Sequence, residues 1–171
     1  MKRAIAIALL LISGCSGSDR KAETSTNQAA PVGLEAAAIE AGVIPDPKNS
    51  DITGLYARDT DRVCVVPTAT AFRLGVFVDY GDQQSCGGSG VVTRVGEKLH
   101  VEFDKVEGCS FEARFEGDAI VFPGRLPDAC QKLCQRRASM AGLDVARLSE
   151  SVSEASTLRD SRGKLLCNSG E

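Results

Sequence analysis

The chain has 171 residues, a formal net charge of −3 and an apolar fraction of 43%, with 5% aromatic residues and no tryptophan. This length suits one domain with a sizeable core, and the acidic balance argues against a nucleic-acid binder, which needs a basic surface to neutralise phosphates. The scarcity of aromatic residues also argues against a large aromatic-lined ligand groove.

The first residues have the pattern of an export signal. Lys2 and Arg3 form a charged start, and residues 4–12 form an apolar stretch. This stretch is much shorter than the roughly 20 residues that span a bilayer as a helix. We therefore expect a cleaved signal rather than a permanent membrane span.

The residues Ile12, Ser13, Gly14 and Cys15 resemble the lipobox of bacterial lipoproteins. In that class the cysteine receives a diacylglyceryl group, the signal is cut before it, and the new amino group is acylated. The resemblance implies that residues 1–14 are removed and that Cys15 becomes a stable multi-chain lipid anchor. Because Ser16 rather than aspartate follows, the sorting habit of the class implies the outer membrane, with the domain facing the periplasm. An ordinary secretory signal with a chance cysteine is the alternative.

The next segments predict a tether and a short helix. From Cys15 to residue 32 the composition is Ser, Thr, Ala, Gln and charge, which predicts a flexible tether. Within residues 33–50, the run Leu34–Ala41 predicts a short helix ended by Gly42, followed by a linker. Residues 51–171 are then expected to form a single compact domain. Removal of Lys2 and Arg3 with the signal lowers the formal net charge from −3 to −5.

From Ile52 onward apolar residues alternate with polar ones, which predicts strands with one solvated face. The clearest runs are Phe72–Asp79, Leu99–Asp104 and Cys109–Phe115, separated by polar or glycine-bearing breaks such as Gly81–Gly90. The expected fold is mainly β (α+β): an antiparallel meander or small barrel of six to seven strands, braced by disulfides.

One or two helices are expected to follow the strands. Residues 127–142 begin with Pro127 and Asp128, carry apolar residues at helical spacing and end at Gly142. A second helix is predicted from about Asp144, with apolar residues at helical spacing in Val145, Leu148, Val152 and Ala155.

The cysteines predict a disulfide framework. Of seven cysteines, six remain once Cys15 is assigned to lipid, and an even set in an oxidising compartment is typical of disulfide bonding. The candidates are Cys64, Cys86, Cys109, Cys130, Cys134 and Cys167. No metal site and no cofactor are expected, since zinc sites normally use tighter spacings than the CxxxC at Cys130 and Cys134.

The CxxxC spacing limits the pairing. Four residues apart on a helix, Cys130 and Cys134 would have Cβ atoms about 5 to 6 Å apart, whereas a disulfide needs about 3.5 to 4.5 Å. Each should therefore bond a different partner. A meander places Cys86 and Cys109 at one end of the sheet, so the preferred pair is Cys86 with Cys109. Cys64 and Cys167 are left for the two helix cysteines, in either order.

Two further features of the sequence have residue types that catalysis uses. The run Ser85–Gly90 (SCGGSG) fails as a nucleophile elbow because Val91 stands where glycine is required, so we interpret it as a hairpin loop held by Cys86. His100, the only histidine, shares a polar strand face with Glu102 and Asp104. This stripe could serve a general base or two metal ligands, but a solvated face is the simpler interpretation.

These observations predict a non-catalytic, lipid-anchored lipoprotein of the cell envelope. It would act as a binding or structural module, attached to the membrane through Cys15, with an envelope protein as partner and no nucleic acid. One alternative is a periplasmic inhibitor of a lysozyme-like or proteolytic enzyme, because small disulfide-rich β lipoproteins include lysozyme inhibitors. The other is a hydrolase or metal enzyme that uses His100.

Overall fold

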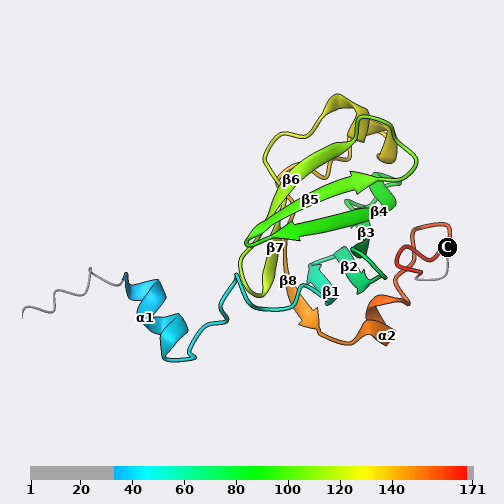
Figure 1. Ribbon diagram of the computed structural model, residues 1–171. Helices are drawn as coiled ribbons and strands as arrows, with labels where there is room; N and C mark the ends of the chain where they lie inside the picture. Colours follow the sequence, from blue (N-terminus) through cyan, green and yellow to red (C-terminus); the bar gives the residue numbers. More distant parts are fainter. Residues whose placement is uncertain (1–32, 169–171) are drawn as a thin grey trace, which may run out of the picture. The chain divides into compact units, whose positions relative to one another are not determined.

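The computed structural model describes residues 33–168, and within them eight strands form one closed antiparallel barrel. Each strand pairs with the next along the chain, and the last strand pairs with the first (Figure 1). The strands are β1 (Gly54–Arg58), β2 (Asp61–Pro67), β3 (Phe72–Asp79), β4 (Ser85–Val95), β5 (Lys98–Phe103), β6 (Ser110–Phe115), β7 (Ala119–Val121) and β8 (Asp144–Ser149). The mainly β, disulfide-braced fold is thus confirmed. The predicted signal, Cys15 and the predicted tether lie outside the described residues.

The short N-terminal helix is also confirmed. α1 spans Leu34–Glu40, and Gly42 adopts a φ of 69°, as a glycine just past a helix end commonly does. None of the residues in α1 is buried.

The alternating pattern fills the barrel with side chains. Along β5 and β6, every second residue is buried and the residues between them are exposed. Small and branched side chains suit such an interior because a barrel of eight strands is just wide enough for side chains to fill. The interior residues include Val63, Val65, Leu74, Val76, Val92, Val101, Phe111, Phe115, Ile120 and Val145.

The prediction of six or seven strands and a helix from Asp144 is wrong, because Asp144–Ser149 forms β8. Val145 points into the core and Leu148 is 63% exposed, so the helical spacing of these two residues was coincidental. β8 pairs with β1 on one side and β7 on the other. Without it both of those strands would present unpaired backbone edges, so closure of the barrel outweighs helix propensity. In the described residues that follow β8, there is one helical turn, α2 (Val152–Ala155).

The helix predicted over residues 127–142 is also wrong. A 3-10 helix, η1 (Asp128–Leu133), forms at its start, but Cys134 is extended and Arg136 has a φ of 57°. Cys134 forms an isolated antiparallel bridge with Cys86 of β4. A helix cannot continue through a residue whose backbone pairs with a strand. The segment between β7 and β8 instead arches over one end of the barrel (Figure 1), where Ala138 and Met140 join the core.

The disulfides are Cys64–Cys167, Cys86–Cys134 and Cys109–Cys130. The expectation that Cys130 and Cys134 bond different partners is confirmed. The preferred pair of Cys86 with Cys109 is wrong, as is the assignment of Cys64 and Cys167 to the two CxxxC cysteines. The reason is the missing helix: η1 brings Cys130 to Cys109, and the extended residue after η1 brings Cys134 to Cys86.

The predicted hairpin loop at Ser85–Gly90 is the first half of β4. Two of its glycines, Gly88 and Gly90, reflect crowding rather than a turn. A Cβ on Gly88 would lie 2.9 Å from Cδ2 of Leu133, and a Cβ on Gly90 would collide with the carbonyl of Glu102. These glycines let neighbouring chain segments approach the strand closely.

Candidate functional site

A cleft of about 650 Å³ lies beside β3 and the first half of β4. Three separate chain segments form its walls: residues 104–106 after β5, residues 132–135 at the end of η1, and residues 160–166 of the C-terminal segment. The size lies within the range of ligand pockets in proteins, about 300 to 1,000 Å³. We therefore treat this cleft as the candidate ligand site.

The floor of the cleft belongs to β3 and β4. Phe77, Gly87 and Ser89 lie on the outer face of the two strands, because the register pairs Phe77 with Gly87 and Gly75 with Ser89 while Val76 points into the barrel. Gly87 is open to the cleft, since a Cβ there would meet no atom closer than 3.6 Å. The floor therefore offers a ligand both backbone and an aromatic side chain.

All three disulfides fix the walls of the cleft. Cys86–Cys134 joins the floor to the wall at residues 132–135, and both cysteines line the cleft. Cys109–Cys130 links the turn after β5 to η1, and so holds two walls together. Cys64–Cys167 fastens the C-terminal wall to β2. Such cross-links hold the site in one geometry before any ligand arrives.

A second apolar cluster supports the C-terminal wall. Leu166 and Cys167 pack on the outer face of β2 against Cys64 and Val66, together with Ala155 of α2. Ser89 of β4 donates its hydroxyl to the carbonyl of Leu166 over 2.8 Å. The C-terminal segment is therefore anchored by packing, a hydrogen bond and a disulfide.

Asp160 shapes the loop above the floor. Its carboxylate accepts hydrogen bonds of 2.9 Å from the backbone amides of Arg162 and Lys164, and Gly163 between them has a φ of 80°. Desolvation raises the pKa of Asp160, but the backbone bonds of Lys164 and Arg162 and the Arg162 side chain outweigh it, so the pKa lies below its ordinary value. The ionised form of Asp160 thus holds the loop.

The lining of the cleft is positively charged, whereas the protein as a whole is acidic. Its lining contains five cationic residues, namely Arg73, Lys105, Lys132, Arg162 and Lys164, and two anionic residues, namely Asp104 and Asp160. Arg73 forms a 2.6 Å ion pair with Asp104 at the edge of the cleft, with 20% of the Arg73 side chain exposed. A local positive field in an acidic protein concentrates anionic ligands at this position.

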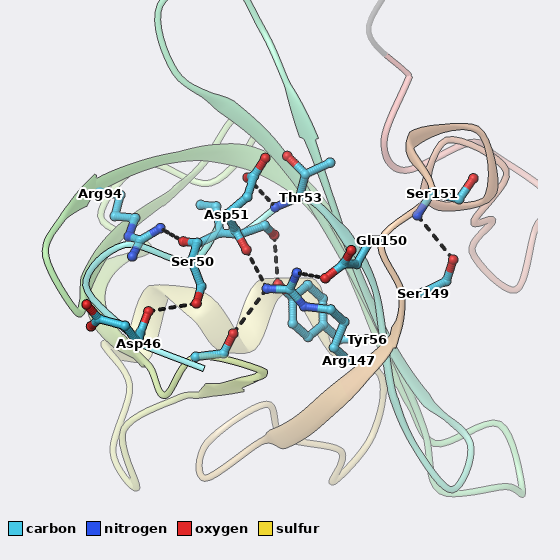
Figure 2. A network of polar contacts seen from close by, with 12 residues as sticks. Asp46, Ser50, Asp51, Thr53, Tyr56, Arg94, Arg147, Ser149, Glu150 and Ser151 are labelled. Carbon is cyan, nitrogen blue, oxygen red and sulfur yellow. Dashed lines mark hydrogen bonds and ion pairs between the residues drawn. The ribbon is translucent and has the colours of Figure 1, made fainter. Parts of the chain in front are cut away.

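A polar network around Arg94 and Arg147 closes the end of the barrel opposite the segment between β7 and β8 (Figure 2). Arg147 donates to the carbonyls of Asp51 and Gly117, and forms a 3.0 Å ion pair with Glu150. Its guanidinium carbon lies 5.4 Å from the ring centre of Tyr56. Only 11% of the Arg147 side chain is exposed. This network fixes residues 46–53 over the end of the barrel.

Arg94, the other arginine of this network, also holds residues 46–53 in place. Its guanidinium donates to the carbonyls of Pro47 and Ser50 and lies 4.9 Å from the ring centre of Phe115. Tyr56 donates its buried hydroxyl to the carbonyl of Ile52 over 2.8 Å, and desolvation raises its pKa to about 12. We interpret this end as structural, because Arg94 and Arg147 each donate to at least two backbone carbonyls of the same chain.

His100 does not lie at the cleft. It sits on the exposed face of β5, opposite Glu112 in the ladder with β6, and its Nδ1 lies 2.7 Å from the Glu112 carboxylate. Of the polar stripe that was predicted to accompany it, Glu102 shares the exposed face, whereas Asp104 lines the cleft. Within the described part of the chain, no group of three or more histidine, cysteine, aspartate and glutamate side chains could hold a metal ion.

The sequence did not identify the cationic residues of the cleft. They are scattered from position 73 to position 164, and none belongs to a recognisable motif. The sequence offered one indication that these cations lie together, namely their closeness to cysteines. Lys132 lies between Cys130 and Cys134, and Lys164 lies three residues before Cys167. Without the disulfide pairing, that signal could not show that the segments meet.

Comparisons of the chain with protein-family models, with curated proteins and with solved structures find no match. None of the helices in residues 33–168 is long and apolar enough to cross a membrane.

Proposed function

We propose that the chain is a non-catalytic binding module of the cell envelope, anchored by lipid on Cys15, whose ligand site is the cleft beside β3 and β4. The observation that carries the proposal is the cleft itself. Its three walls come from distant parts of the sequence, and each is held by a disulfide. A concave, cross-linked site with charged and apolar lining favours ligand binding at low conformational cost.

The state of the polar side chains in the cleft supports binding rather than catalysis. Ser89 donates to the carbonyl of Leu166, Asp104 pairs with Arg73, and Asp160 holds its own loop. A nucleophile with an adjacent base needs side chains within hydrogen-bond reach of each other. In the described lining, these groups instead bond to structural partners.

The anchor is proposed from the lipobox-like residues Ile12 to Cys15. With Ser16 after the cysteine, we place the domain on the outer membrane, facing the periplasm. The three disulfides support an oxidising compartment, because disulfides persist there and are rare in the cytosol.

The anchor is tested by intact mass and fractionation. Protein extracted from membranes should lack residues 1–14 and carry acyl mass on Cys15, and a Cys15→Ser variant should leave the membrane fraction. Full-length protein in the soluble cell extract, with its thiols open to a labelling reagent, would overturn this part of the proposal.

The cleft is tested by photo-crosslinking in whole cells. A benzophenone amino acid replaces Lys132, which lines the cleft, or Lys98, which is exposed on β5 away from it. We expect position 132 to give an adduct of one defined mass in the envelope fraction and position 98 to give none. Equal labelling at both positions, or no adduct at position 132, would contradict the cleft as the ligand site.

A further inference from the structure

We infer that the cleft recognises an acidic peptide segment of a partner protein, with Lys105, Lys132 and Arg162 contacting its carboxylates. This inference rests on the proposed function, in which the cleft is the ligand site. It adds the chemical class of the ligand and the residues that select it.

The positive charge of the cleft is not cancelled by its own acidic residues. Asp104 is paired with Arg73, and the Asp160 side chain is 8% exposed and bonded to backbone amides. Arg162 reaches Asp160 only over 3.4 Å, and 80% of its own side chain is exposed. Its guanidinium therefore remains accessible to a ligand.

Lys105 and Lys132 are exposed, and among the described residues neither forms an ion pair. On an isolated surface this would be ordinary, because a solvated lysine needs no partner. Here both line one cavity together with Arg162. The whole chain carries a net negative charge, whereas the cleft brings these three cations together.

The three cations come from three different walls. Lys105 follows β5, Lys132 lies in η1, and Arg162 lies in the C-terminal loop. The disulfides hold these walls, so the charges are brought together without the ligand having to organise them. Preorganised charges complementary to a ligand increase both association rate and selectivity.

The rest of the lining favours a peptide over a simple anion. Phe77, Val106 and Leu133 give the cleft apolar surface, and Gly87 and Gly88 expose backbone. An acidic peptide has carboxylates for the cations, aliphatic stems for the apolar surface and amides for the strand backbone. An inorganic anion would use only the charges. A membrane surface would not enter a cleft walled on three sides.

The test uses the full lipidated chain in detergent and a fluorescent hexaglutamate peptide, with hexaglutamine as the neutral probe. We expect hexaglutamate to bind, as measured by anisotropy, and hexaglutamine not to bind. The cleft variant Lys105→Gln, Lys132→Gln, Arg162→Gln should weaken binding by about tenfold or more. A control variant with the same charge change elsewhere, Lys48→Gln, Lys98→Gln, Arg137→Gln, should bind like the unmodified chain.

Further arms distinguish other anions. Inorganic phosphate should not displace hexaglutamate beyond the effect of equal ionic strength of sodium chloride, and anionic phosphatidylglycerol vesicles should not compete. Displacement by either, binding of hexaglutamine, or equal loss in the two triple variants would overturn the inference. If the cleft variant does not fold, the salt dependence of hexaglutamate binding to the unmodified chain replaces it, and a flat dependence would contradict the inference.

Failure of the inference and failure of the proposed function give different results. If the benzophenone at position 132 labels a partner but adding Lys105→Gln and Arg162→Gln to the same chain leaves the yield of that adduct unchanged, the cleft binds a ligand that is not acidic. If position 132 labels nothing, the cleft is not the ligand site and the proposed function fails.

Discussion

Leu166 lies so close to Gly75 that a Cβ on residue 75 would sit 2.5 Å from Cβ of Leu166. The same atom would sit 2.7 Å from Sγ of Cys64, which is bonded to Cys167. The missing side chain at position 75 therefore allows the C-terminal segment and its disulfide to lie on the outer face of β3. That segment is a wall of the cleft, so this contact links the fold to the site.

Gly75→Ala is expected to lower the free energy of unfolding by about 1 to 3 kcal/mol, because the added methyl group must displace Leu166 or the disulfide. Urea denaturation measures the change. Gly87→Ala is the matched control, since its Cβ would meet nothing closer than 3.6 Å. A Gly75→Ala protein as stable as the Gly87→Ala protein would show that the C-terminal segment does not require the close contact.

The disulfides should differ in their contribution to stability. Cys64–Cys167 closes a span of 103 residues and Cys109–Cys130 a span of 21. In the chain-entropy description, loss of the first costs about 4 to 5 kcal/mol and loss of the second about 3 kcal/mol. Paired Cys→Ala variants, compared by denaturant midpoints, measure the difference. The reverse order would contradict an origin in the unfolded chain.

Where the sequence pattern depends on one element alone, it predicted the structure correctly. The strands β5 and β6 were found because each has one buried and one exposed face, and β3 was found because Leu74, Val76 and Val78 point into the barrel at every second position, although its outer face is covered. The helix before Gly42 was found because its end is marked locally. In both cases the signal and the structure lie in the same few residues.

Where contacts between distant residues decide the structure, the predictions from the sequence were wrong. Asp144–Ser149 has apolar residues at both helical and strand spacing, and only the free edges of β1 and β7 select the strand. Cys134 ends η1 because it pairs with Cys86. The cleft was missed for the same reason, since Lys105, Lys132 and Arg162 belong to three segments that come together only in the folded chain.

Arg147→Met tests the network that closes the other end of the barrel. Methionine keeps an apolar stem but leaves the carbonyls of Asp51 and Gly117 without the guanidinium donor. We expect a loss of about 1 to 3 kcal/mol in the free energy of unfolding, measured by urea denaturation.

The control for Arg147→Met is Arg58→Met. The Arg58 side chain is 54% exposed in its ion pair with Asp144, so this change should cost at most about 1 kcal/mol. Equal losses would show that Arg147 contributes no more than a surface pair.

Two aspartates with shifted pKa values, Asp160 and Asp61, should affect acid stability in opposite directions. The pKa of Asp160 is lowered in the folded chain, because hydrogen bonds from Lys164 and Arg162 outweigh desolvation. Its stabilising contribution is therefore present above the unfolded pKa of about 3.9 and is lost as the pH falls through the folded pKa. Asp160→Asn should make the loss of stability on acidification shallower.

Asp61 is expected to have the opposite effect on the stability of the fold in acid. Desolvation raises its pKa above the ordinary value despite the amide of Asp79, so its ionised form is disfavoured in the folded chain and acidification relieves that cost. Asp61→Asn should therefore make the loss of stability on acidification steeper. Urea midpoints measured from about pH 6 down to about pH 2 follow both variants through the range in which carboxylates titrate. If Asp160→Asn leaves the slope unchanged or makes it steeper, the backbone bonds to Asp160 do not favour its ionised form, and the C-terminal wall of the cleft is held by packing, the Ser89–Leu166 hydrogen bond and the Cys64–Cys167 disulfide.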